Sequence, residues 1–398
     1  MVGSKSYHRL SLLIALVLLA LSTTSGFMQN RIQPASPSMK DKLALQMMAS
    51  NLWRKTGRSE IVLPENSDYP LGIIHFIGGA VVGAAPQQSY KPLLEGLSAQ
   101  GFLVIATPIS LNQFDHQGEA CEAARQFRLA YAEVEDYYGV RMAARIPVFG
   151  LGHSLGAKLH VLLSSYPEVL AAGRGRKANV LLSFNNFSAK ESVPLWGELK
   201  NFFGKEKIDE ITKTVSKVTD TIRQVKETTP FLDQVKYLSI AEDFIPKVFD
   251  AVNSKLGDLP SEFNPTPEQT WELVETSYAV PNTMVVQFRN DQIDQSSYLA
   301  QLLEKRFGTS GDLHFCRLDG SHITPNFQDL EEVAATTATA QGLDGAAVGR
   351  AAAYASAPGR LELEDLVRTV GYYLKAQSLW EREVDNNNAL QSWDTDQV

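Results

Sequence analysis

Ser154 stands at the centre of the pentapeptide Gly152-His153-Ser154-Leu155-Gly156. The residues before it, 146–150, are mostly apolar and include β-branched side chains, and the residues after it, 157–163, are apolar at helical spacing. This pattern predicts a strand, a tight turn with Ser154 at its apex, and a helix. Glycines two residues on either side relieve the crowding around a serine on such a strained turn. The pentapeptide therefore predicts a nucleophile elbow, which presents a serine hydroxyl to a carbonyl carbon.

A serine hydroxyl is a weak nucleophile at its ordinary pKa and needs a general base within hydrogen-bonding reach. His322 lies in a Gly-Ser-His turn directly after the last strand candidate, residues 313–318. In chains with such an elbow, the chemical groups follow the carboxyl ends of successive strands in the order serine, acid, histidine. We therefore predict that His322 is the base.

Five other histidines follow the N-terminal segment. His160 falls within a predicted helix and His314 within a predicted strand, where structural roles are expected. His153 adjoins the serine in sequence, but its side chain is expected to point elsewhere in an elbow. His75 ends the first core strand and His116 precedes a helix. These two and His153 are candidates for lining or supporting the site, although His116 could simply begin its helix.

The acid that orients the base is expected after the sixth or the seventh strand of this fold. After residues 179–184, which correspond to the sixth strand of the fold, the chain has Asn185 and Asn186 and no acid, whereas Asp291 and Asp294 follow residues 283–288, which correspond to the seventh. Asp291 lies at the usual distance from the strand end, and we predict that it orients His322. Asp294 is the alternative, and otherwise a loop carboxylate or a helix N-cap.

Negative charge that develops on the substrate oxygen needs two backbone N–H donors. One is predicted to be Leu155, directly after the nucleophile. The other is expected from Ile77 or Gly78, after the first core strand. A phenylalanine, Phe76, stands where a glycine usually follows the histidine of such a loop, so the sequence leaves the choice of amide open.

Apolar stretches alternate with helical patterns along the body of the chain. Continuous apolar runs of this kind indicate a parallel sheet covered on both faces. The predicted fold class is α/β: an α/β-hydrolase fold with a mostly parallel, doubly wound sheet and a helical cap insertion. The strand candidates are residues 71–76, 102–107, 146–150, 179–184, 283–288 and 313–318, and the helix candidates are residues 85–101, 117–138, 297–307 and 361–380.

We expect the core to form from two parts, residues 66–188 and 278–382. Within the second part, residues 334–357 are rich in Ala, Thr and Gly and predict a flexible insertion or a frayed helix. Residues 383–398 are polar and predict a disordered tail.

Residues 189–277 interrupt the alternation and are predicted to form a helical cap or lid. Isoleucine and valine recur there at spacings of three and four residues, which predicts an amphipathic helix over about 208–225. Three interpretations remain open at this point: the helix covers the site, it packs on the body away from the substrate, or it lies on a membrane surface.

The N-terminal segment has the composition of targeting sequences. Residues 1–26 combine basic residues, a short apolar run and small residues, which is typical of a signal peptide, with a membrane anchor as the alternative. Residues 27–55 are rich in Ser, Met, Gln and basic residues and poor in acids, like a transit peptide. With Phe27 after the predicted cleavage point, the segment resembles the bipartite plastid presequence of diatoms. The resemblance implies a plastid destination, with secretion or an endomembrane location as alternatives.

The composition of the chain limits the classes of binding partner and cofactor that the sequence predicts. The chain has 398 residues and a formal net charge of −8, and no basic stripe that would favour nucleic acid. Its two cysteines lie far apart and its histidines are scattered, so we predict no disulfide framework, no metal site and no cofactor. The oligomeric state is left open.

Several strings together resemble a known family. These are His75-Phe76-Ile77-Gly78-Gly79-Ala80 with Gly83-Ala84-Ala85-Pro86, Asn112-Gln113-Phe114-Asp115-His116, Gly150-Leu151-Gly152-His153-Ser154-Leu155-Gly156, Ser183-Phe184-Asn185-Asn186 and Gly320-Ser321-His322. They are similar to an α/β-hydrolase-like family of cyanobacteria, plants and algae, catalogued as domain of unknown function thirteen-fifty. The likeness covers about residues 71–326. It implies the fold and a plastid setting, and it implies no substrate.

The function predicted from these residues is that of a serine hydrolase of the carboxylesterase, lipase or thioesterase type. Its substrate would be a small-molecule or lipid ester, and the cap could give peripheral membrane contact. One alternative is a non-catalytic ligand-binding or scaffold protein on the same fold. Another is an acyltransferase that uses the same three residues.

Overall fold

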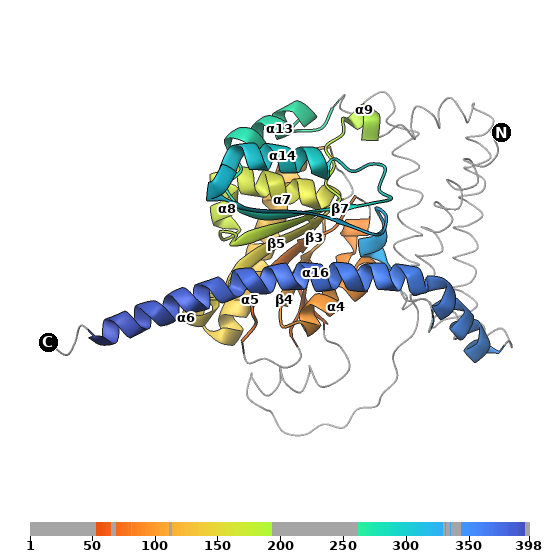
Figure 1. Cartoon of the computed structure of the whole chain (residues 1–398), viewed down its shortest axis with the longest axis horizontal. Helices are drawn as coiled ribbons and strands as arrows, with labels where there is room; N and C mark the ends of the chain where they lie inside the picture. Colours follow the sequence, from red (N-terminus) through yellow and green to blue (C-terminus); the bar gives the residue numbers. More distant parts are fainter. Residues whose placement is uncertain are drawn as a thin grey trace, which may run out of the picture. The chain divides into compact units, whose positions relative to one another are not determined.

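The computed structural model describes residues 53–64, 69–80, 82–110, 114–192, 262–328, 331, 335 and 344–394 (Figure 1). The predicted signal peptide, most of the transit-like segment and the amphipathic helix at 208–225 lie outside the described residues. The chain divides into two compact units. The whole sheet belongs to the unit formed by residues 34–188, 262–327 and 358–398, and so do the three residues predicted to carry the chemistry.

Eight strands of the described residues form one sheet in the order β1-β2-β4-β3-β5-β6-β7-β8. The six strands from β3 to β8 are parallel, whereas β2 is antiparallel to both β1 and β4. The predicted fold class is confirmed by this mostly parallel sheet. The strands are β1 (Trp53–Thr56), β2 (Ser59–Val62), β3 (Ile73–Ile77), β4 (Leu103–Thr107), β5 (Val148–His153), β6 (Ala178–Leu182), β7 (Asn282–Phe288) and β8 (Asp312–Leu318).

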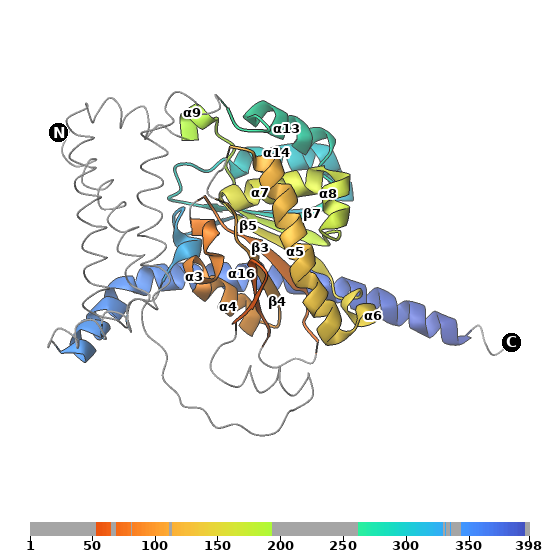
Figure 2. The same cartoon turned by 180° about the vertical axis from the view of Figure 1, so that it is seen from behind.

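Helices cover both faces of the sheet (Figures 1 and 2). On one face, α4 (Lys91–Ala99) and α16 (Gly345–Asp394) pack on the sheet through residues such as Leu94, Leu366 and Val370. On the other face lie α5 (His116–Tyr138), α7 (Leu155–Ser165) and α14 (Ser296–Phe307). Because β3 to β6 are buried between these layers, they are almost wholly apolar.

The remaining elements are short, apart from α13 (Pro267–Thr276). They are η1 (Val82–Ala84), α3 (Pro86–Ser89), α6 (Val140–Ala143), α8 (Pro167–Ala172), α9 (Ala189–Ser192), η3 (Gly308–Ser310) and η4 (Thr324–Asn326). Within the described parts of the chain, no helix has the length and apolar character that crossing a bilayer demands.

The core begins earlier than predicted. Strands β1 and β2 form an antiparallel hairpin whose turn contains Gly57 with a φ of 57°. The hairpin adds two strands before residue 66, and the transit-like segment, predicted to reach residue 55, overlaps β1. Each strand is only four residues long and β1 carries Arg54 and Lys55, so neither shows the continuous apolar run of a central strand.

The helix predicted over residues 85–101 is two helices, α3 and α4, that meet at Tyr90. The break has a local cause. Pro92 lies at the start of α4, where the missing N–H of proline is tolerated, whereas within one continuous helix its ring would clash with the preceding turn. The interruption places Tyr90 at a junction, fully buried.

The predicted cap, residues 189–277, extends too far toward the C-terminus, because it includes α13. Residues 193–261 lie outside the described residues, but α13 packs against α7 and α14 in the body. Val274 and Tyr278 are buried in the same apolar cluster as residues of α7 and β7. A capping box of Thr266 and Gln269 starts α13, so this segment is a regular part of the core.

The C-terminal predictions were also partly wrong. Residues 383–394, expected in a disordered tail, are helical in α16, and so are residues 345–357, for which a flexible insertion or a frayed helix is predicted. Alanine has the highest helix propensity, which accounts for residues 345–357. Extending a packed helix needs no new nucleation, which favours helix in residues 383–394 despite their polar composition.

Candidate active site

Ser154 occupies a strained turn between β5 and α7. Its φ of 56° and ψ of −120° are rare for a residue with a side chain. The flanking glycines are required by contact with backbone. A Cβ on Gly152 would lie 2.4 Å from the carbonyl oxygen of Gly156, and a Cβ on Gly156 would lie 2.0 Å from that of Ile77. The elbow predicted from the sequence is therefore present in the structure.

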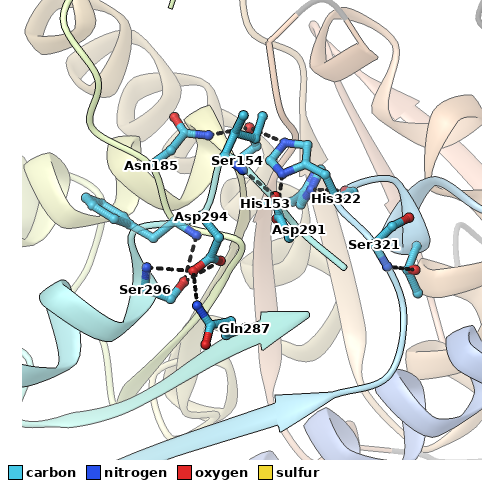
Figure 3. A network of polar contacts seen from close by, with 12 residues as sticks. His153, Ser154, Asn185, Gln287, Asp291, Asp294, Ser296, Ser321 and His322 are labelled. Carbon is cyan, nitrogen blue, oxygen red and sulfur yellow. Dashed lines mark hydrogen bonds and ion pairs between the residues drawn. The ribbon is translucent and has the colours of Figure 1, made fainter. Parts of the chain in front are cut away.

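The structure brings Ser154, His322 and Asp291 together (Figure 3). Nε2 of His322 lies 3.0 Å from Oγ of Ser154, and Nδ1 lies 2.7 Å from Oδ2 of Asp291. Asp291 follows β7 and His322 follows β8, so neighbouring parallel strands deliver them to the same edge of the sheet as the elbow. The distances allow a proton to pass from the serine to an imidazole held by a carboxylate.

The side chain of Asp291 is fully buried beneath His322. Burial raises the pKa of this carboxyl, but the hydrogen bond and charge of His322 and the N–H of Ile293, 3.0 Å from Oδ1, outweigh it, and the pKa lies below its ordinary value. A carboxylate that remains ionised can hold the Nδ1–H tautomer of His322 and stabilise the imidazolium.

Asp294 serves a different purpose. Its carboxylate accepts hydrogen bonds from the backbone N–H and the hydroxyl of Ser296, at 2.8 and 2.9 Å, and from the amide of Gln287 at 2.9 Å. Burial raises its pKa. Asp294 therefore binds Ser296, the first residue of α14, and the geometry selects Asp291 as the partner of His322.

Asn185 is a neighbour of the nucleophile that the sequence did not reveal. Its Nδ2 donates to Oγ of Ser154 at 3.1 Å, from the side opposite to His322 (Figure 3). The sequence does contain one indication of Asn185: it lies in the loop after β6, at the edge of the sheet where Ser154, Asp291 and His322 also lie. The fold favours an orienting acid at that position, so the sequence does not predict an amide donor there.

Tyr90 is a second residue that sequence reasoning missed. Its hydroxyl lies 2.8 Å from Nδ1 of His153 and accepts the N–H of Gly79 at 2.7 Å. Nε2 of His153 lies 2.9 Å from the backbone carbonyl oxygen of His322. Nothing in the sequence marked Tyr90, because its position depends on the break between α3 and α4.

Leu155 begins α7, so its N–H has no acceptor within the helix. The predicted upstream donors are less well aimed. Ile77 still belongs to β3, aligned with Gly152 of β5. The carbonyl oxygens of Ile77 and Gly78 lie close to Gly156. Because the N–H of a trans peptide is opposed to its carbonyl, the N–H of Gly78 points away from α7.

Two of the three candidate lining histidines lie away from these contacts. His75 is fully buried; its Nδ1 accepts from Arg176 at 2.7 Å, and its ring stacks on Phe127. His116 lies at the start of α5 and stacks on Phe263, with ring centroids 4.4 Å apart. Among the residues that the structure describes, no group of three His, Cys, Asp or Glu side chains could hold a metal ion.

A mostly parallel sheet with a serine elbow after β5, an aspartate after β7 and a histidine after β8 defines an α/β-hydrolase-fold protein. Within that class, the chain belongs to the family described as "Protein of unknown function (DUF1350)", which matches residues 52–349. The family resemblance seen in the sequence is thereby confirmed.

Solved structures of esterases are similar to the chain at low identity. One of two fungal esterases from Rhizomucor miehei has 13% identity and a TM-score of 0.44, covering 92% of this chain and 96% of its own. A thermostable esterase from Pseudomonas putida has 14% identity and a TM-score of 0.43, covering 86% and 92%. An esterase from Pyrococcus furiosus has 11% identity and a TM-score of 0.39, covering 87% and 99%. No curated protein sequence matches the chain.

Proposed function

We propose that the protein is a serine hydrolase that cleaves an ester or thioester through an acyl-enzyme. The observation that carries the proposal is the position of the His322 ring, which lies within hydrogen-bonding distance of Ser154 Oγ and of Asp291 Oδ2 at once. A scaffold protein on this fold has no need of a serine on a strained turn that also meets a histidine held by a buried carboxylate.

The reaction follows from the three side chains. Oγ of Ser154 forms a bond to the substrate carbonyl carbon while Nε2 of His322 takes the hydroxyl proton. The bond to the leaving oxygen or sulfur then breaks, and His322 returns the proton to that atom. Water repeats the sequence on the acyl-serine: His322 takes its proton, the acid is released, and Oγ of Ser154 recovers a proton. Asp291 stays ionised throughout and stabilises the imidazolium.

We assign the oxyanion site to the N–H groups of Leu155 and Ala80. The carbonyl of Gly79 accepts the N–H of Gly83 at 2.8 Å, so the N–H of Ala80, on the same peptide, points the other way. A Cβ on Gly79 would lie 3.1 Å from Cβ of Ser154, which places this peptide beside the nucleophile. Ala80 therefore replaces Gly78 and Ile77 in our assignment.

Asn185 adds a second hydrogen bond to the nucleophile. Oγ of Ser154 can donate its proton to His322 while it accepts from Nδ2 of Asn185. The amide donor remains in place as negative charge grows on Oγ during deprotonation, so it favours the attacking form of the serine.

The preference for an apolar or lipid-derived acyl group, and contact with a membrane surface, rest on the amphipathic pattern at 208–225, outside the described residues. The plastid destination rests on residues 1–55. A reporter fused to residues 1–55 should enter plastids, and its secretion would remove this part of the proposal.

A fluorophosphonate probe tests the central proposal because it labels serines that are activated by a base. The full chain should be labelled and the Ser154→Ala variant should not. Ser165→Ala is a matched control: Ser165 lies on the same helix, and its hydroxyl donates to the carbonyl of Val161, away from the site. Its labelling should equal that of the wild type. Absence of labelling of the folded wild type would overturn the hydrolase proposal.

The class of bond is tested next with a series of p-nitrophenyl esters of increasing acyl length and with acyl-coenzyme A thioesters. Hydrolysis that rises with acyl length supports a lipid-derived substrate. Acyl transfer to an added alcohol in preference to water would instead identify an acyltransferase with the same three residues.

A further inference from the structure

A chain of hydrogen bonds with one permitted direction joins the loop after β3 to the loop after β8. The backbone carbonyl of His322 can only accept, so Nε2–H of His153 donates to it. In the neutral imidazole the other nitrogen, Nδ1, is then an acceptor, and it receives the proton of the Tyr90 hydroxyl. The oxygen of Tyr90 in turn accepts the N–H of Gly79.

The direction is fixed because both side chains are held neutral. His153 is 2% exposed and Tyr90 is 0% exposed. Burial and the nearby His322 lower the pKa of His153 to about 3, and burial raises the pKa of Tyr90 to about 12. The ring centroids of His153 and His322 lie 5.0 Å apart. Because His153 is neutral, it adds no second positive charge beside His322 when His322 takes the proton of Ser154.

Tight packing keeps the chain of hydrogen bonds in place. A Cβ on Gly78 would lie 2.6 Å from the ring of Tyr90, and one on Gly79 would lie 3.3 Å from its hydroxyl. Asn326, in η4 beyond His322, donates to the backbone carbonyl of Ser89, next to Tyr90, at 3.3 Å. Tyr90 therefore contacts the loop that precedes Ala80, and the residue before it accepts a hydrogen bond from the segment that follows His322.

We propose that Tyr90 and His153 are positioning residues that hold the oxyanion loop, residues 78–80, and the histidine loop, residues 319–326, at a fixed separation. The inference rests on the proposed function, since it gives the bridge a catalytic purpose. The nucleophile, the base and the oxyanion donor come from three separate segments, and rate enhancement requires their geometry to be set before the substrate arrives. The bridge touches all three segments, and both of its side chains are buried.

The test compares Tyr90→Phe, His153→Leu and His153→Gln in the full chain, each checked for folding by thermal unfolding. The probe is the fluorophosphonate, whose saturation kinetics separate its binding from its reaction with Ser154. We expect the maximal reaction rate to fall about tenfold in Tyr90→Phe and more in His153→Leu, with the half-saturating probe concentration unchanged. Glutamine retains an N–H donor for the His322 carbonyl, so His153→Gln should recover most of the loss.

A second readout does not depend on catalysis. Hydrogen–deuterium exchange of the peptide that carries residues 319–326 should quicken in Tyr90→Phe, although Tyr90 lies far away in the sequence. Tyr131→Phe is the matched control, because Tyr131 is also buried and its hydroxyl donates to the carbonyl of Ala143, distant from the site. Tyr131→Phe should lose a similar hydrogen bond but leave both the rate of labelling and the exchange of residues 319–326 unchanged.

The outcomes separate the bridge from the proposed function. Unchanged exchange at 319–326 in both Tyr90→Phe and His153→Leu would overturn the bridge, whatever the reactivity. An equal loss of rate in His153→Gln and His153→Leu would overturn the role of the donor to His322. Faster exchange in a chain whose wild type does not react with the probe would leave the bridge standing and remove the proposed function.

Discussion

Nδ1 of His322 lies 2.7 Å from Oδ2 of Asp291, while Asp294, three residues further on, turns its carboxylate to the start of α14. The two aspartates are both shielded from solvent and close in sequence, but they have opposite pKa shifts. The pKa of Asp291 lies below its ordinary value, since His322 outweighs the effect of burial, and burial raises the pKa of Asp294. Substituting each aspartate in turn therefore tests which carboxylate acts on His322.

Asp291→Asn should lower the rate of fluorophosphonate labelling by a factor on the order of 10⁴, because an amide cannot hold the Nδ1–H tautomer or stabilise the imidazolium. Asp294→Asn keeps an acceptor oxygen for Ser296. It should retain the rate within about threefold and lower the free energy of unfolding by about 1 kcal/mol. A larger loss of reactivity in Asp294→Asn than in Asp291→Asn would reverse the assignment.

The sequence predicted the residues whose positions follow from topology. Ser154, Asp291 and His322 each follow the end of a core strand, and parallel strands bring such positions to one edge without any detail of packing. The same reasoning distinguished the deeply placed His160 from His322. The prediction that His75 ends the first core strand is wrong, because β3 extends to Ile77 and His75 is its middle residue, where its ring contacts Arg176.

The residues that the sequence did not reveal depend on side-chain direction. Tyr90 reaches His153 because Pro92 divides a helix that the apolar pattern presents as continuous. Asn185 reaches Ser154 through a loop that has no periodic pattern. The choice between the amides of Ile77 and Gly78 stays open in the sequence for the same reason: it depends on the carbonyl directions in the loop.

Asn185→Ala should lower the rate of labelling about tenfold, because Ser154 loses the donor that stabilises charge on Oγ. Asn185→Asp should lower it further, since a carboxylate in that place opposes negative charge on Oγ and competes for the hydroxyl proton. Asn186→Ala is the control: Asn186 donates to the carbonyl of Pro267 and should affect stability alone. Equal rates in Asn185→Asp and the wild type would show that the contact has no part in the reaction.

Three buried histidines should make the protein sensitive to mild acid. Burial lowers the pKa of His153 and of His160 to about 3, and burial lowers that of His75 well below 6.5. All three are neutral in the folded state and take up protons on unfolding below about pH 6.5. The unfolded state then binds more protons, so stability is fully present above pH 6.5 and is lost as the pH falls toward 3.

Urea unfolding at pH 7.5, 6.5 and 5.5 measures this loss. Each histidine contributes a slope of up to about 1.4 kcal/mol per pH unit. His160→Asn replaces the imidazole with an amide, which does not titrate. The variant should reduce the slope of unfolding free energy against pH, below pH 6.5, by about one third. An unchanged slope in this variant would show that His160 is already protonated in the folded protein.

Gly156 should be the least replaceable glycine of the elbow. A Cβ there would lie 2.0 Å from the oxygen and 2.6 Å from the carbonyl carbon of Ile77, and both are backbone atoms that cannot rotate away. Gly156→Ala must separate α7 from the end of β3, so it should lower the free energy of unfolding by about 3 kcal/mol or more and reduce labelling of Ser154.

Gly175→Ala is the matched substitution, because a Cβ at Gly175 meets no atom within 4 Å and its backbone is not in the left-handed region. It should be neutral or stabilise the protein by about 0.5 kcal/mol, since alanine restricts the unfolded chain more than glycine does. Urea unfolding of the two variants, with the labelling rate measured on each, tests the difference. If Gly156→Ala proved as stable and as reactive as Gly175→Ala, the close contact between the elbow and β3 would not be required for the site.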